Sequence, residues 1–182
     1  IATGLTLDQS EPIPFEGELI NEGGQQFRMG NYNSTINLLI ASVKWYPYSF
    51  KSYRHLAAAY KAQGKEVPID EFAYLEMLNQ KDFANANRVF DEAREKFPGW
   101  LIFSEQSIYD TGHKFLNTGD VKAALEVFKI YVQAFPKSWY SFDSLAAAWA
   151  KLGNKKEAIV NYKKVLELSA DNEAARKALA IA

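Results

Sequence analysis

Two histidines and a scatter of carboxylates are the side chains of this sequence that could take part in acid–base or metal chemistry. His55 and His113 are 58 positions apart, and neither stands in a metal-ligand spacing such as H-E-x-x-H. Either could meet a carboxylate such as Asp110 or Asp143 only if separate helices brought the two together. Acid–base catalysis also needs a pocket that shifts the pKa values of these groups. We therefore expect both histidines to face solvent or a groove.

Other catalytic motifs are absent from the sequence. It has no G-x-S-x-G nucleophile elbow, no S-x-x-K pair and no glycine-rich phosphate loop. It has no cysteine, which rules out disulfides, thiolate metal sites and cysteine nucleophiles. The sequence therefore predicts a protein that is not an enzyme and that has no cofactor and no metal site.

Charge and hydropathy exclude two further classes of partner. Lys and Arg number 21 against 22 Asp and Glu, so there is no basic excess of the kind that nucleic-acid binding requires. No run of about 18 apolar residues occurs, so no membrane insertion is predicted. With 48% hydrophobic and 14% aromatic residues, the chain can bury a sizeable core.

The elements that must position these side chains are helices. From Glu16 almost to the C-terminus, apolar residues recur at three- and four-residue spacing, and breaks such as Gly30-Asn31 or Phe135-Pro136 interrupt them at short intervals. Residues 1–15 lack this period and contain Pro12 and Pro14, which predicts an extended lead-in or linker. We expect the chain to be a piece of a longer protein on that account.

An internal repeat decides the fold class. Residues that punctuate or pack helices recur at an offset of 89 positions, in the pairs Gly23/Gly112, Gly30/Gly119, Pro47/Pro136, Ser52/Ser141, Leu56/Leu145 and Gly64/Gly153. Self-similarity at a fixed offset is typical of repeat proteins. The offset exceeds two 34-residue units by about 21 residues, which predicts an extra helix and a loop between the halves.

A finer unit lies within each half, and its clearest copy joins two helices of the second half. It consists of Phe142, Leu145, Ala146 and Trp149, followed by Ala158, Tyr162 and Val165. This spacing resembles the tetratricopeptide repeat, W-x2-L-G-x2-Y followed by A-x3-F. The resemblance implies an all-α solenoid of antiparallel helix hairpins with about 9–10 helices, because one hairpin cannot bury its apolar faces alone.

The predicted domain organisation is a single repeat domain over residues 16–182. It comprises a first half (16–64), an irregular segment (65–104), a second half (105–170) and a capping helix (172–181). Within the irregular segment, Ile69–Gln80 is either the second helix of the preceding pair or the first helix of a pair completed by Asp82–Phe97. The spacing of Tyr74 and Ala86 favours the second alternative.

The resemblance also implies a function, which is binding a protein or peptide segment in a concave groove lined by the first helix of each pair. Carried over to this sequence, the groove candidates are Phe27, Lys51, Arg54, Lys61, Tyr109, His113, Leu116, Asp143 and Lys151, and the last unit also offers Tyr140. The lysine and asparagine pattern that clamps chaperone C-termini is absent. A basic patch of Lys51, Arg54 and Lys61 remains, which favours a segment with apolar anchors and acidic residues.

Two alternatives remain open. The runs Ser138–Ala146 and Ala158–Tyr162 are similar to repeat tails of some bacterial serine hydrolases, which implies an accessory C-terminal domain of a larger enzyme. A structural role is the other alternative, in which the chain self-associates through Trp100 and its neighbours.

Overall fold

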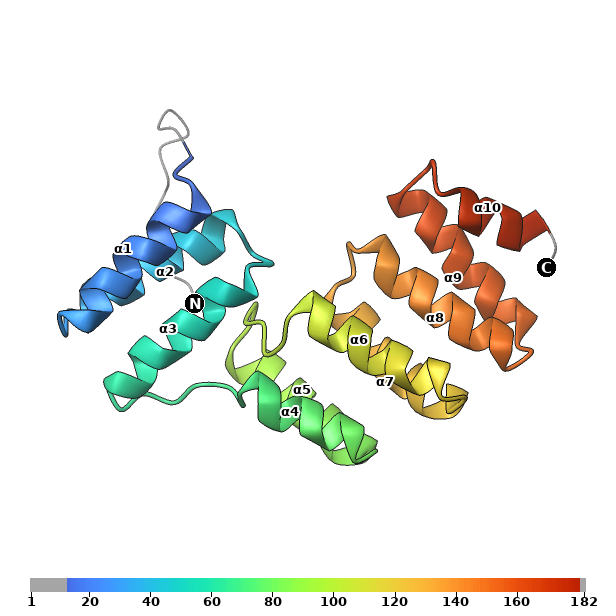
Figure 1. The fold of residues 1–182 in the computed structure, drawn as a ribbon, viewed down its shortest axis with the longest axis horizontal. Helices are drawn as coiled ribbons and strands as arrows, with labels where there is room; N and C mark the ends of the chain where they lie inside the picture. Colours follow the sequence, from blue (N-terminus) through green and yellow to red (C-terminus); the bar gives the residue numbers. More distant parts are fainter. Residues whose placement is uncertain (1–12, 181–182) are drawn as a thin grey trace. The chain divides into compact units, whose positions relative to one another are not determined.

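The computed structural model describes residues 13–180, and that part of the chain folds into ten helices (Figure 1). Their bounds are α1 Glu16–Arg28, α2 Tyr32–Trp45, α3 Phe50–Ala62, α4 Glu71–Asn79, α5 Phe83–Lys96, α6 Glu105–Asn117, α7 Val121–Ala134, α8 Trp139–Lys151, α9 Lys155–Leu168 and α10 Glu173–Ala180. The pairs α1 with α2, α6 with α7 and α8 with α9 form antiparallel hairpins, as in the tetratricopeptide fold, and the all-α prediction is confirmed. Most of the predicted lead-in (residues 1–12) and Ile181 lie outside the described residues.

The 89-residue offset of the sequence reappears in the helix boundaries. Every bound of α1, α2 and α3 lies 89 positions before the corresponding bound of α6, α7 and α8. The punctuation explains this agreement: Gly64 and Gly153 follow α3 and α8 with φ of +69° and +75°. This left-handed conformation ends a helix and is readily adopted only by glycine. The boundaries are therefore set locally.

The contacts within the chain group into two compact units. Unit 1 comprises Ile1–Glu71 with Arg88–Ser104, and unit 2 comprises Phe72–Asn87 with Glu105–Ala182, so that the division runs through α5. The single repeat domain over 16–182 stays a prediction. Each unit is described by itself below.

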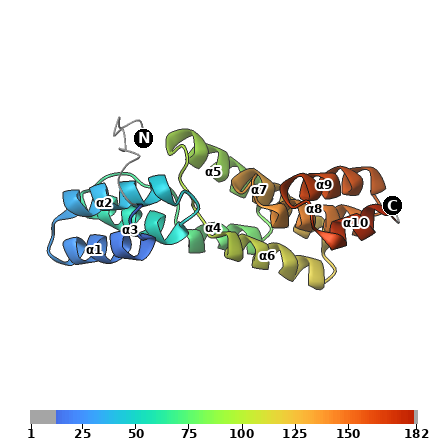
Figure 2. The same cartoon turned by 90° about the horizontal axis from the view of Figure 1, so that it is seen from above.

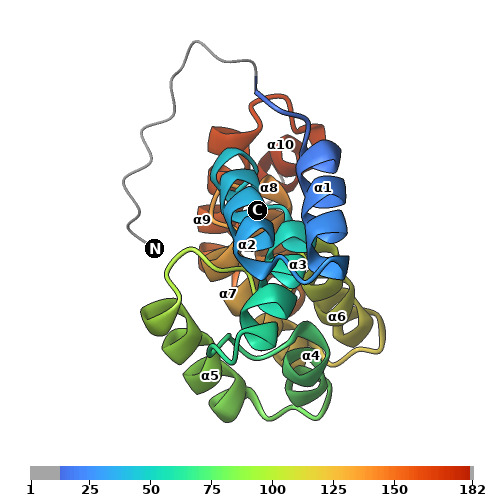
Figure 3. The same ribbon diagram turned by 90° about the vertical axis from the view of Figure 1, so that its left-hand side faces the viewer.

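In unit 1, α1, α2 and α3 pack side by side (Figure 3). Their core contains Ile20, Leu39 and Leu56, of which Leu39 and Leu56 are fully buried. A hydrogen bond of 2.8 Å between the hydroxyls of Ser42 and Ser52 joins α2 to α3 inside this core. The first helices of the predicted groove, α1 and α3, are thus held by α2 behind them.

In unit 1, an aromatic cluster around Trp100 packs against part of α3. The ring of Trp100 packs against Tyr53 and Tyr60 of α3, with centroids 5.7 Å and 5.9 Å apart, and against Phe97 at 5.9 Å. Trp100, which self-association would use, is therefore engaged within its own unit.

The segment predicted to be irregular contains a helical hairpin. The hydroxyl of Tyr74 on α4 donates to the carbonyl of Ala86 on α5 at 3.2 Å, and Lys81 in the turn between them has φ of 62°. The pairing of α4 with α5 is the one that the spacing of Tyr74 and Ala86 favours. Figure 3 shows the two helices joined at this turn.

Unit 2 continues the hairpins to the end of the described chain. α6 packs on α7, α8 packs on α9, and α10 lies against α9 (Figure 2). Gly112 of α6 lies close to the ring of Phe128 of α7, and both residues are buried. The α6–α7 hairpin therefore positions α6 and α8 as neighbouring first helices.

None of the helices in the described part of the chain is both long enough and apolar enough to cross a membrane.

Candidate partner-binding surfaces

Unit 1 carries a basic surface, which we define as Lys51, Arg54 and Lys61 on α3. These residues follow one another at three- and seven-residue spacing, so they share a face of the helix. All three are exposed, and within residues 13–180 none of them forms a salt bridge. The surface therefore presents positive charge that the described chain does not neutralise.

A hollow of about 230 Å³, the unit 1 hollow, lies between α1, α2 and α3. It is lined by Gly23, Gly24, Phe27, Arg28, Thr35, His55 and Ala58. Glycines and alanine line much of it because they project no side chain or only a methyl group. The hydroxyl of Thr35 donates to the carbonyl of Gly23 at 3.2 Å, which removes a polar group from the hollow.

His55 links the unit 1 hollow to the basic surface. Its pKa lies below the ordinary value, first because burial disfavours the charged imidazole and then because Arg54 and Lys51 repel it. Lys51 and Arg54 lie on the same helix, four and one residues before His55. An apolar hollow and an unpaired basic surface thus adjoin each other on the first helices of unit 1.

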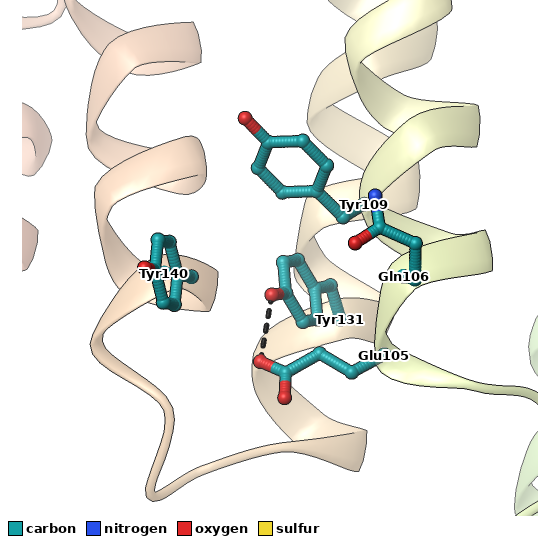
Figure 4. A pocket seen from close by; sticks show the side chains of 5 residues that line it. All are labelled: Glu105, Gln106, Tyr109, Tyr131 and Tyr140. Carbon is teal, nitrogen blue, oxygen red and sulfur yellow. Dashed lines mark hydrogen bonds between the residues drawn. The ribbon is translucent and has the colours of Figure 1, made fainter. Parts of the chain in front are cut away.

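Unit 2 contains a larger hollow of about 540 Å³, which we call the tyrosine hollow. Its lining residues are Glu105, Gln106, Tyr109, Tyr131 and Tyr140. In Figure 4, Tyr109 and Glu105 extend from α6, Tyr140 faces them from α8, and Tyr131 lies between them on α7. Three phenol rings and a carboxylate therefore surround one space.

The Tyr131 hydroxyl donates to Oε1 of Glu105 at 2.8 Å, and both residues line the tyrosine hollow. Tyr131 is only 1% exposed. Its pKa is raised well above the ordinary value, first by burial and then by its hydrogen bond to Glu105. The phenol accordingly stays protonated, and its donated hydrogen bond holds the Glu105 carboxylate in place.

His113 lies beside the tyrosine hollow and connects α6 to α8. Its ring packs against Tyr109 in a tilted arrangement with centroids 4.1 Å apart, and its Nε2 is 3.1 Å from the Ser144 hydroxyl. Burial lowers the pKa of His113, and the nearby Asp110 carboxylate partly opposes this effect. The imidazole therefore contacts Tyr109 and Ser144, and no carboxylate of residues 13–180 forms a hydrogen bond with it.

The other groove candidates of unit 2 differ in exposure. Asp143 is half-buried, and desolvation raises the pKa of its carboxyl group. Lys151 is exposed at the end of α8, whereas Leu116 is only 6% exposed and contributes to the core. The structure thus places Tyr109, His113 and Asp143 on the first helices, with Leu116 turned inward.

Matching positions of the two units carry opposite chemistry. Arg54 of α3 corresponds to Asp143 of α8 at the 89-residue offset, and Lys51 corresponds to Tyr140. The helices have the same lengths and boundaries, so the difference lies in the side chains alone. One unit is cationic where the other is acidic and aromatic.

Three of the residues in the tyrosine hollow, Glu105, Gln106 and Tyr131, are not among the groove positions implied by the sequence. Glu105 is the first residue of α6, and Tyr131 lies on the second helix of its pair. The repeat could have pointed to Tyr131, because a tyrosine stands there where the first half of the sequence has Ser42. A tyrosine in a core position needs a partner for its hydroxyl.

The described residues offer no metal site, since they contain no group of three or more His, Asp or Glu side chains that could hold an ion. Glu92, which stands near Glu95 as a possible carboxylate pair, is instead 2.6 Å from Arg88 one turn away.

Comparison with known proteins finds no matching family model and no matching curated protein. Among solved structures, the chain is similar to MamA 41-end from Desulfovibrio magneticus RS-1, with 17% identity, a TM-score of 0.41, and coverage of 93% of this chain and 85% of the other. It is also similar to YrrB, described as a TPR protein with an unusual peptide-binding site, with 13% identity, a TM-score of 0.41, and coverage of 88% and 89%. The comparisons give no support to the resemblance to hydrolase tails. The fold assignment rests on the helix hairpins and the repeat.

Proposed function

We propose that this chain is a non-catalytic interaction module, and that unit 1 binds a segment of another protein that carries acidic residues and an apolar anchor. The anchor would occupy the unit 1 hollow beside Phe27 and Ala58. Carboxylates of the same segment would lie along the basic surface. In the tetratricopeptide repeats that this chain resembles, the first helix of each hairpin binds the partner, and α1 and α3 correspond to such helices in unit 1.

One observation carries the proposal: three exposed cations that form no salt bridge within residues 13–180 lie on the helix whose His55 and Ala58 line a mainly apolar hollow. Exposed cations at this spacing attract acidic segments and speed their association. A hollow lined largely by glycines, Ala58 and the Phe27 ring accepts an aliphatic or aromatic side chain. The combination favours a partner that offers both features.

The test uses the purified chain and an array of short labelled peptides in which one Leu or Phe is flanked by Asp and Glu. Matched peptides carry Asn and Gln at the acidic positions. We expect selection of the acidic peptides, and an affinity loss of about tenfold or more in the variant Arg54→Glu plus Lys61→Glu. The affinity should also fall with added salt, because exposed charges are screened.

A matched control makes the same change of net charge elsewhere. Lys122→Glu plus Lys163→Glu alters exposed residues on α7 and α9, the second helices of unit 2. We expect this variant to bind the acidic peptides as the wild type does. Unchanged affinity in the Arg54→Glu plus Lys61→Glu variant, or equal binding of acidic and amide peptides, would reject the proposal for unit 1.

A further inference from the structure

We infer that the tyrosine hollow of unit 2 is a second binding site, which takes the cationic side chain of an arginine or lysine from a partner polypeptide. The inference rests on the proposed function in supposing a polypeptide partner. It concerns a different unit and the opposite charge, so the two can be tested separately.

The Glu105 carboxylate is the first reason. Its Oε1 accepts the hydrogen bond of Tyr131, and within residues 13–180 no Lys, Arg or His forms a salt bridge with this side chain. The second carboxylate oxygen, Oε2, is therefore available to an incoming donor. Because Tyr131 already orients the carboxylate, a cation that binds it incurs little further loss of side-chain freedom.

The aromatic rings are the second reason. Tyr140 is 51% exposed, and one face of its ring stacks on Trp139 with centroids 3.7 Å apart. Tyr109 is covered on one side by His113 at 4.1 Å. Each ring lines the hollow, and within residues 13–180 no second ring covers it. The faces of such rings attract guanidinium and ammonium groups.

The size and charge of the surroundings agree with a cationic guest. A volume of about 540 Å³ holds one long side chain together with the backbone that carries it. Asp143 adds a half-buried carboxyl group on the same first helix as Tyr140. A cation bound nearby would favour the ionised form of this carboxyl, whose pKa is raised by burial.

Unit 1 serves as a comparison within the same chain. The positions that match Tyr109, Tyr131 and Tyr140 are Ile20, Ser42 and Lys51. None of these residues provides an aromatic ring, and Lys51 would repel a cation. The frame of the helices is common to both units, so the tyrosines and not the fold explain why the second site is confined to unit 2.

The test is an NMR titration of the whole chain, labelled at its tyrosine rings, with short glycine- and serine-rich peptides. Three peptides carry arginine, lysine or citrulline at the same central position. Citrulline has the shape of arginine without its charge. We expect the arginine and lysine peptides to shift the Tyr109, Tyr131 and Tyr140 resonances, with arginine stronger because its planar group stacks on rings. The citrulline peptide should leave them unchanged.

Two variants identify the site. Glu105→Gln removes the charge but keeps an oxygen that can accept the Tyr131 hydrogen bond. We expect it to weaken the binding of the arginine peptide about tenfold. Tyr140→Ala removes an exposed ring and should weaken it by several-fold. Circular dichroism and melting temperature establish that each variant is folded. Equal binding of citrulline and arginine, or full binding by folded Glu105→Gln, would overturn the inference.

The two sites are distinguished by exchanging probes and variants. Arg54→Glu plus Lys61→Glu should still bind the arginine peptide, and Glu105→Gln should still bind the acidic peptides. Loss of acidic-peptide binding alone removes the proposal for unit 1 and leaves this one intact. Failure of the cationic peptides while the acidic ones bind removes the inference and leaves the proposed function.

Discussion

Gly112 of α6 lies so close to the ring of Phe128 of α7 that no side chain fits between them. A Cβ atom built on Gly112 would lie 2.7 Å from Cδ1 and 2.9 Å from Cζ of the ring, and closer still to Cε1. Phe128 is fully buried, so its ring has no solvent into which to move. The matching glycine of the first half, Gly23, is different, because its Cβ would meet Leu39 at an ordinary 3.4 Å.

Gly112→Ala should therefore destabilise the chain, whereas Gly23→Ala should not. Overpacking in a core of this kind costs about 1 to 3 kcal/mol. Alanine in a helix is about 1 kcal/mol better than glycine, which offsets part of the loss at Gly112 and makes Gly23→Ala neutral or slightly stabilising. Urea denaturation of both variants measures the difference. Equal effects at the two sites would contradict the close approach.

Trp100→Ala should destabilise unit 1 by roughly 2 to 3 kcal/mol, because it removes the ring that covers Tyr53 and Tyr60 on α3. Phe72→Ala is the control, since that side chain is 80% exposed and its removal should change stability by less than about 0.5 kcal/mol. Thermal denaturation followed by circular dichroism compares the two variants. A Trp100→Ala variant as stable as Phe72→Ala would show that the aromatic cluster contributes little.

His113 should make the stability of the chain sensitive to mild acid. Its folded-state pKa lies below the ordinary 6.5, so the unfolded chain binds the proton more strongly. This contribution to stability is complete above about pH 6.5 and is lost as the pH falls through the folded-state pKa. In His113→Gln, which can keep a hydrogen bond to Ser144, the loss of stability between about pH 7.5 and pH 5 should be smaller. Identical pH profiles would remove His113 as the cause.

His55 should make the binding of acidic peptides depend on pH. Arg54 and Lys51 on its own helix disfavour the charged imidazole, and Arg28 of α1 lines the same hollow. A bound carboxylate offsets these cations and raises the pKa of His55, so binding takes up a proton. Affinity should therefore increase as the pH falls from about 7.5 to 5.5. His55→Gln should abolish this increase, and its persistence there would assign it to another group.

Much of the fold could be predicted from the sequence because its determinants are local. Gly64 and Gly153 end helices through their own backbone conformation, and Asp120 and Asn154 cap helices whose first turns follow them directly. The offset between Gly23 and Gly112 predicted which helices would match. The candidate site was predictable only in part, since Tyr109 and Tyr140 lie on the expected first helices but Glu105 and Tyr131 were not among the groove positions.

The sequence by itself determined the helical period, the positions of the breaks and the repeat of three helices, because these depend on residues within a turn or two of one another. Only the tertiary structure decided that Trp100 would cover part of α3, and that the Tyr131 hydroxyl would hold Glu105, 26 positions away, in the wall of the tyrosine hollow. Such contacts depend on which helix faces pack together, and packing is a property of several segments at once. The sequence gives the charge at each matching position, whereas the fold determines whether that charge lies beside a hollow.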